Sequence, residues 1–187
     1  MNFAEYNVQD ANLEEVLLAL KSLDTVEAVA LGGSRSTGAS EENSDYDIYV
    51  YCSEIPTGKT RENLLGKYCS IAEFGNHYWE SEDNTVMNNG IPVDIIYREV
   101  DRFGRYIDTV IKGGKAFNGY TTAFWHNIKN SKVLFDKTGT FTKFRDMAQI
   151  DFPENLRSAI IKNNRNLLNG KLPSYDRQVK KAQERGD

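Results

Sequence analysis

The sequence predicts an α/β protein in which a small mixed β-sheet with flanking helices is followed by a helical C-terminal part. Short apolar runs that end at Gly, Pro or Asn alternate with helical periodicities over the first part of the chain. Strand signals then fade and helical patterns continue. The 187 residues, 40% of them hydrophobic, are enough for one buried core. We therefore expect an α/β domain at 1–115 and a helical region at 116–187.

The first expected elements are a helix and two strands. Residues 11–23 carry apolar side chains at helical spacing and follow Asp10, a residue type that caps helices. The run VEAVAL (26–31) is short, contains β-branched residues and ends at two glycines, which predicts a strand. The run YDIYVYC (46–52) is apolar in character and favours a strand near the centre of the sheet.

Breakers and periodicity divide the rest of the chain. Pro56 and Gly58 interrupt it after the second strand, and Gly113 and Gly114 end a later helix. The other elements expected in the first part are a helix at 59–71, strands at 74–81 and 91–97, a turn at 88–90 and a helix at 103–111. Beyond residue 115 the candidate helices are 121–130, 138–149, 153–170 and 173–187.

Composition argues against several classes of protein. No apolar run approaches the roughly 20 residues that a membrane span needs, and the N-terminus lacks the basic and apolar pattern of a secretory signal. The two cysteines, Cys52 and Cys69, suggest neither a disulfide framework nor a metal-ligand spacing. We therefore expect a cytoplasmic protein with no membrane partner.

Charge is distributed unevenly along the chain. The net charge of −4 argues against a general nucleic-acid binder. Residues 155–187, however, hold eight Lys or Arg against three acids, a charge of +5, which leaves −9 for residues 1–154. Such a mixed basic run usually forms a solvated helix face, and contact with a polyanion such as nucleic acid through this segment is the alternative.

Three aspartates form the first part of a candidate site. Asp45 and Asp47 are two residues apart at the start of a predicted strand, so their side chains point to the same face. Two adjacent carboxylates repel each other, and a hard divalent cation is the common solution. Asp94, in the apolar run PVDIIY, is a charged residue that needs a partner when buried. If the two strands are neighbours, all three carboxylates can meet.

The glycine-rich loop supplies the second part of the candidate site. Gly32 and Gly33 allow tight turns that leave N–H groups available to a phosphate, and the Ser34 hydroxyl can donate to the same oxygens. Arg35 adds positive charge, although surface solvation is an equally good explanation of it. Phosphate donors beside metal-binding carboxylates are the parts that phosphoryl or nucleotidyl transfer requires.

Together these motifs resemble the signature of the DNA polymerase beta-type nucleotidyltransferase superfamily. The signature consists of Gly33-Ser34, ten intervening residues, Asp45-Tyr46-Asp47 and the later in-strand Asp94. The likeness is greatest to small bacterial members, which include antibiotic nucleotidyltransferases and minimal nucleotidyltransferases paired with toxins. It implies that 1–115 is the catalytic domain.

The resemblance also implies a role for each residue. Gly33 and Ser34 would hold the terminal phosphates of a nucleoside triphosphate, with Arg35 beside them, and ATP is the first choice of nucleotide. Asp45 and Asp47 would bind two Mg²⁺ ions. Asp94 would bind one of them and help to deprotonate the attacking hydroxyl. A hydroxyl-bearing acceptor, not identified by the sequence, would attack the α-phosphate, and pyrophosphate would leave.

Other residues have two readings each. His77 and His126 are better explained by packing than by catalysis, because nothing in the sequence places a nucleophile or metal partner beside them. The acidic residues Glu80, Glu82 and Asp83 form either a solvated strand end or a surface that attracts a cationic acceptor.

Three functions remain open at this stage. The first is Mg²⁺-dependent nucleotidyl transfer to a small molecule, such as an antibiotic. The second is transfer to a macromolecule, a protein tyrosine or an RNA end, which the basic C-terminal segment favours. The third is a non-catalytic nucleotide-binding protein that keeps the fold. The presence of all three aspartates weighs against the third.

Overall fold

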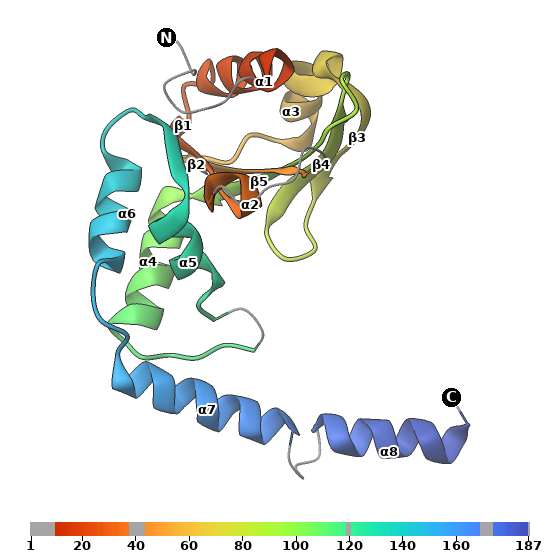
Figure 1. Ribbon diagram of the computed structural model, residues 1–187, viewed down its shortest axis with the longest axis vertical. Coiled ribbons are helices and arrows are strands. Elements are labelled where there is room, and N and C mark those ends of the chain that lie inside the picture. Colours follow the sequence, from red (N-terminus) through yellow and green to blue (C-terminus); the bar gives the residue numbers. More distant parts are fainter. Residues whose placement is uncertain (1–9, 38–43, 119–120, 169–173, 187) are drawn as a thin grey trace.

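The computed structural model describes residues 10–37, 44–118, 121–168 and 174–186 (Figure 1). In chain order the elements are α1 (Ala11–Lys21), β1 (Val26–Leu31), α2 (Gly33–Thr37), β2 (Tyr46–Cys52), α3 (Gly58–Leu65), the 3-10 turn η2 (Gly66–Tyr68), β3 (Cys69–Asn76), β4 (Ser81–Met87), β5 (Pro92–Glu99), α4 (Val100–Ile111), α5 (Ala123–Asn130), β6 (Lys132–Asp136), α6 (Thr140–Ala148), α7 (Glu154–Leu168) and α8 (Tyr175–Arg185).

The strands form one mixed sheet in the order β3-β4-β5-β2-β1-β6. Strands β2 and β5 are parallel, and the other neighbouring pairs are antiparallel. Strand β2 lies between β5 and β1, as its apolar sequence predicts. The predicted mixed α/β fold is therefore confirmed.

Helices cover both faces of the sheet (Figure 1). Because alternate residues of a strand point to opposite faces, β2 sends Ile48 and Val50 to one hydrophobic cluster and Tyr49 and Tyr51 to the other. The first cluster includes the buried face of α1, and the second includes aromatic residues of α4, α5 and α6. In α1 the Asp10 carboxylate accepts the first free N–H groups of the helix, so the predicted cap is confirmed.

Three predicted elements differ from the structure. The helix expected to reach residue 71 ends near residue 68, and β3 begins at Cys69. The strand expected at 74–81 is instead the end of β3, a turn and the start of β4. Strand β4, SEDNTVM, is mostly polar, and its pairing with β3 and β5 overrides its weak strand propensity.

The third difference lies in the C-terminal part. Only helices were expected after residue 115, but Lys132–Asp136 forms β6, which pairs with β1. The run KVLFD is too short for its apolar pattern to indicate a strand, and pairing with β1 is what makes it one. The division of the chain at residue 115 stays a prediction. Helices α7 and α8 extend away from the body, and α8 has no buried residue (Figure 1).

Within the described ranges, no helix combines the length and apolar character needed to cross a membrane.

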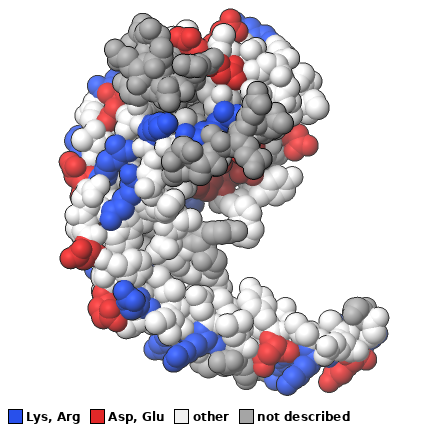
Figure 2. Space-filling model, in the orientation of Figure 1, with Lys and Arg blue, Asp and Glu red and all other residues white. Residues whose placement is uncertain are grey.

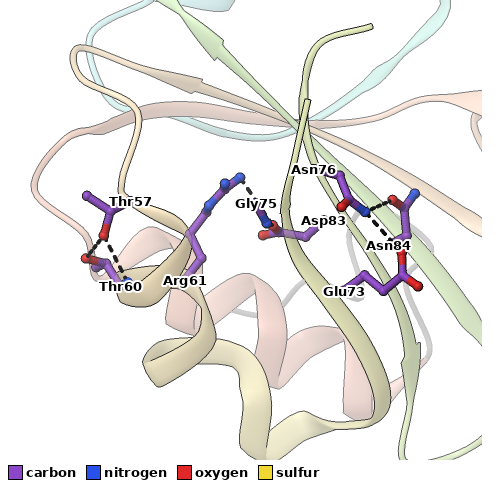
Figure 3. Close-up of polar contacts among 8 residues, drawn as sticks. All are labelled: Thr57, Thr60, Arg61, Glu73, Gly75, Asn76, Asp83 and Asn84. Carbon is purple, nitrogen blue, oxygen red and sulfur yellow. Dashed lines mark hydrogen bonds and ion pairs between the residues drawn. The ribbon is translucent and has the colours of Figure 1, made fainter. Parts of the chain in front are cut away.

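A buried ion pair joins α3 to the hairpin of β3 and β4 (Figure 3). Arg61 Nη1 lies 3.2 Å from Asp83 Oδ1, and both side chains are at most 2% exposed. The Gly75 N–H donates to the same Asp83 oxygen, and the Arg61 guanidinium lies over the Tyr97 ring. Burial raises the pKa of the Asp83 carboxyl, although Gly75 and Arg61 oppose this rise. The hairpin is thus held against α3 by a polar contact that excludes water.

We expect Asp83→Ala to lower the free energy of unfolding by about 3–5 kcal/mol, because it leaves the buried Arg61 charge uncompensated. The matched control is Glu62→Ala, which breaks the exposed pair with Lys59 on the same helix and should cost at most about 1 kcal/mol. Urea unfolding measures both. An apolar double variant, Arg61→Met with Asp83→Leu, should recover much of the loss. An equal loss of unfolding free energy in Asp83→Ala and Glu62→Ala would contradict a stabilising role for the buried pair.

Candidate functional site

The register of β2 and β5 brings two of the three aspartates together. Asp47 is the direct partner of Asp94 in the parallel pair, so both side chains lie on the same face of adjacent strands. Asp45 precedes β2 by one residue and is exposed, whereas Asp47 and Asp94 are partly buried. The condition stated from the sequence, that the two strands be neighbours, is met.

The three carboxylates act on one another electrostatically. The pKa of Asp47 is raised first by burial, then by the negative charges of Asp45 and Asp94. In the part of the chain that the structure describes, no three His, Cys, Asp or Glu side chains gather as a ready-made metal site. The structure thus places Asp47 beside Asp94 and under the charge of Asp45, but it does not gather the three carboxylates into one ready-made cluster.

The glycine turn packs directly against Asp47. The Gly32 N–H donates to the Asp47 carbonyl at 2.8 Å, which joins the end of β1 to β2. Gly33 has φ +61°, and a Cβ atom at this position would overlap the Asp47 carboxylate. Glycine is therefore required here both by its backbone conformation and by the close approach of a carboxylate. Ser34 follows in α2 and is partly buried.

Arg35 has structural contacts of its own. Its Nε donates to the carbonyls of Ser44 and Asp45, at 2.8 and 3.1 Å, and its guanidinium lies 4.1 Å from the centre of the Tyr46 ring. These contacts hold the start of β2, and with it Asp45, against α2. The chain around Arg35 is the short helix α2, and residues 38–43 lie outside the described part of the chain.

Two asparagines that sequence reasoning missed extend the site beyond Asp94 (Figure 3). Asn84 Nδ2 donates to Asp94 Oδ1 at 2.9 Å, and Asn84 Oδ1 accepts from Asn76 Nδ2 at 2.7 Å. Asn76 Nδ2 also lies 3.3 Å from Glu73 Oε2. Asn84 faces Asp94 because the two are partners in the β4–β5 register. This contact could have been predicted only by knowing that β4 pairs with β5, and the polar sequence of β4 does not indicate that pairing.

The acidic group at residues 80–83 is divided among three environments. Glu80 forms a two-pronged ion pair with Arg98, with contacts of 2.8 and 2.7 Å. Asp83 is buried with Arg61, so neither of the two roles considered for it from the sequence applies. Glu82 has a raised pKa from burial and from the charges of Asp94 and Glu80. Of these three acidic residues, Glu82 alone forms no ion pair with the described part of the chain.

Two hollows flank the aspartates. A pocket of about 210 Å³ lies at the glycine turn and is lined by Gly32, Gly33, Ser34, Ser36, His126, Asn127, Asn130 and Ser131. A cavity of about 930 Å³ is lined in part by Tyr49 and Ile96. Tyr49 is two residues beyond Asp47 on β2, and Ile96 is two residues beyond Asp94 on β5. Its wall includes Phe103, Tyr106, Phe117 and Phe124. His77 and His126 are both exposed, so the packing role expected for each of them is wrong, and His77 lies in the cavity wall.

Comparison with known proteins supports the reading of these motifs. The sequence matches the family model described as a nucleotidyltransferase domain over residues 13–117, which is more than half of the 187 residues. A comparison with curated proteins gave no match.

Two similar solved structures are a toxin-antitoxin with AMP-PNP and Cid1 in complex with its short product ApU. The first has 15% sequence identity and a TM-score of 0.43, and the match covers 82% of this chain and 91% of that chain. The second has 17% identity and a TM-score of 0.37, and the match covers 67% of this chain and 42% of that chain.

The matched family region contains the glycine turn and both aspartate-bearing strands. It also contains Asn76 and Asn84, and it ends before α5 and β6. The resemblance to the polymerase beta-type superfamily is therefore confirmed, and the chain belongs to the nucleotidyltransferase domain family and is a nucleotidyltransferase.

Proposed function

We propose that the protein transfers a nucleoside monophosphate from a nucleoside triphosphate, with ATP as the first choice, to a hydroxyl of a small-molecule acceptor. The reaction would depend on Mg²⁺ and release pyrophosphate. The observation that carries the proposal is the register pair of Asp47 and Asp94 beside the Gly33 turn. This arrangement offers metal-binding carboxylates and phosphate-binding backbone within one short stretch of surface.

Asp45, Asp47 and Asp94 are the proposed metal ligands. Burial, and after it the negative charges of Asp45 and Asp94, raise the pKa of Asp47, and a divalent cation would relieve that repulsion, which supports this role. Carboxylate oxygen is also the ligand type that Mg²⁺ prefers. When bound, Mg²⁺ would neutralise the charge that develops on the transferred phosphoryl group.

The order of the strands gives the proposed reaction a direction. The glycine turn follows β1, Asp47 is on β2 and Asp94 is on β5, so the proposed phosphate and metal positions follow one line across the sheet. In-line displacement requires the attacking hydroxyl to lie opposite the leaving pyrophosphate. The acceptor would therefore approach over β4, beside Asn84 and Glu82, and Asp94 would accept its proton.

A macromolecular acceptor is the alternative, and the C-terminal arm, which is formed by α7 and α8, favours it. Figure 2 shows Lys and Arg side chains, interspersed with acidic ones, along α7 and α8. Residues 155–187 carry eight basic and three acidic residues. A polyanion such as an RNA end could contact this arm. A non-catalytic nucleotide-binding protein is the further alternative, and it predicts binding without turnover.

We expect Mg²⁺ with a nucleoside triphosphate to raise the melting temperature. Binding to the folded state alone adds about 2.7 kcal/mol of stability at a ligand concentration 100 times Kd. Thermal denaturation with each of the four nucleotides, with and without Mg²⁺, measures the effect. Stabilisation by no nucleotide, even with Mg²⁺, would exclude the proposed function.

Asp47→Asn should lower nucleotidyl transfer by about 100-fold or more, because it weakens the binding of the Mg²⁺ that would neutralise charge on the transferred phosphoryl group. It should also raise the stability of the protein without ligands. The folded-state pKa of Asp47 lies above its ordinary value, so its ionisation costs stability as pH rises through that ordinary value. The stability gain should therefore be present at pH 7 and vanish at a pH low enough to protonate Asp47 in both states. Loss of activity with loss of folding would instead indicate a structural role.

Gly33→Ala should also lower activity by about 100-fold, since its Cβ displaces the Asp47 carboxylate. The control is Gly90→Ala, at φ +85° but with nothing within 4 Å of the added Cβ. Both variants carry the strain of a positive φ, about 1–2 kcal/mol, in unfolding experiments. Only Gly33→Ala should lose pyrophosphate release. Equal activity in the two variants would show that the carboxylate position does not matter.

The acceptor class can be tested with nucleotides labelled on the α-phosphate and incubated with fractionated cell extract. We expect label in the small-molecule fraction, dependent on Asp47. Label in a discrete protein or RNA band would support the alternative acceptor, and removal of residues 169–187 should then reduce it.

A further inference from the structure

The pocket at the glycine turn has a second wall that no sequence motif predicts. Gly32, Gly33, Ser34 and Ser36 form one side, and α5 and the residue after it form the other. The lining contains only Gly, Ser, Asn and His, with no apolar side chain. A void of about 210 Å³ with such walls is suited to a polar ligand.

The charge around this pocket favours an anion. None of the described residues that line it is acidic, although the Asp47 carboxylate lies close to Gly33. Lys132 follows the lining residue Ser131, and its Nζ lies 3.4 Å from the Arg35 carbonyl at α2. A ligand here would thus meet hydrogen-bond donors and a nearby cation, whereas a metal ion would be attracted to the aspartates.

The ring of His126 is oriented by its neighbour in the helix. Asn130 Nδ2 lies 3.1 Å from His126 Nδ1 and also donates to the His126 carbonyl at 2.8 Å. The second contact identifies the amide NH₂ as the group that faces the ring, so Nδ1 accepts a hydrogen bond. The proton of the neutral ring then sits on Nε2, and Nε2 remains a donor in the charged ring too.

The small pocket and the larger cavity share one lining residue. Asn127 lines both, and its Nδ2 donates to the Tyr49 hydroxyl at 2.7 Å. Tyr49 in turn is two residues beyond Asp47 on the same face of β2. One elongated molecule could therefore extend from the polar pocket, past the aspartates, into the aromatic cavity. A nucleoside triphosphate has this character, with anionic phosphates at one end and a stacking base at the other.

We propose that α5 forms the second wall of the nucleotide site and that His126 Nε2–H donates to the terminal phosphates. This inference rests on the proposed function. It also extends the site beyond residues 13–117, the region that matches the family model, because α5 begins at Ala123. Asn127, between the two hollows, would lie beside the sugar. The phosphate contacts would then come from both sides of the pocket.

The test is calorimetric titration of the full chain with ATP and with AMP, both in MgCl₂. His126→Ala should raise the Kd for ATP about tenfold, the loss of one hydrogen bond to a charged group, and leave the Kd for AMP unchanged. His126→Gln keeps an N–H donor and should restore part of the affinity. The matched control is Lys129→Ala on the same helix, where the side chain is exposed and lies over Trp125, and it should change neither constant.

The outcomes separate this inference from the function on which it rests. Wild-type protein that binds no ATP would exclude both. Wild-type protein that binds ATP, with His126→Ala unchanged or equally weakened for ATP and AMP, would exclude only the role of His126. His126 is exposed, so the variant should keep the wild-type melting temperature, and a fall in it would itself contradict the proposed role.

Discussion

The parallel pairing of β2 with β5 is the constraint on which the site depends. It sets Asp47 directly beside Asp94. The pairing is possible because both strands are apolar on the face that packs against α1, so the hydrophobic core determines the register. A slip by one residue would turn the aspartates into the core. Hydrophobic burial on one face thus positions charge on the other.

This arrangement has an energetic cost that the surrounding structure offsets. Asp47 is partly buried beside two like charges, which disfavours its ionised form. Nearby contacts hold the site in place. Arg35 fastens the chain before Asp45, the Gly32 N–H holds the Asp47 backbone, and Asn84 donates to Asp94. Asp47 and Asp94 therefore lie side by side without a ligand, and binding need not first bring these two together.

Much of the catalytic half could be predicted from the sequence, because local signals specify it. The strands at 26–31 and 46–52 have clear apolar runs, and the glycine turn between them has a clear motif. The hairpin of β3 and β4 could not be predicted, because its polar strands lack an apolar pattern and are stabilised by pairing with their neighbours. Asn84 was missed and His126 was assigned to packing for the same reason: what brings each of them near the site is long-range contact. A single sequence does not encode such contacts in residue spacing.

The strands and the helices form different parts of the site. The aspartates and the glycine turn lie on or beside central strands, whose hydrogen bonds hold them rigidly. The cavity beside them is walled by α4, α5 and the turn between β3 and β4. The exposed Trp79 lies in that turn, and the turn is joined to α3 through the buried Arg61–Asp83 pair. Changes in these surrounding elements would alter which molecules fit while the chemistry of the strands stayed the same. The buried pair has a desolvation cost, but it holds in place one part of the wall of the cavity that the nucleotide base would enter.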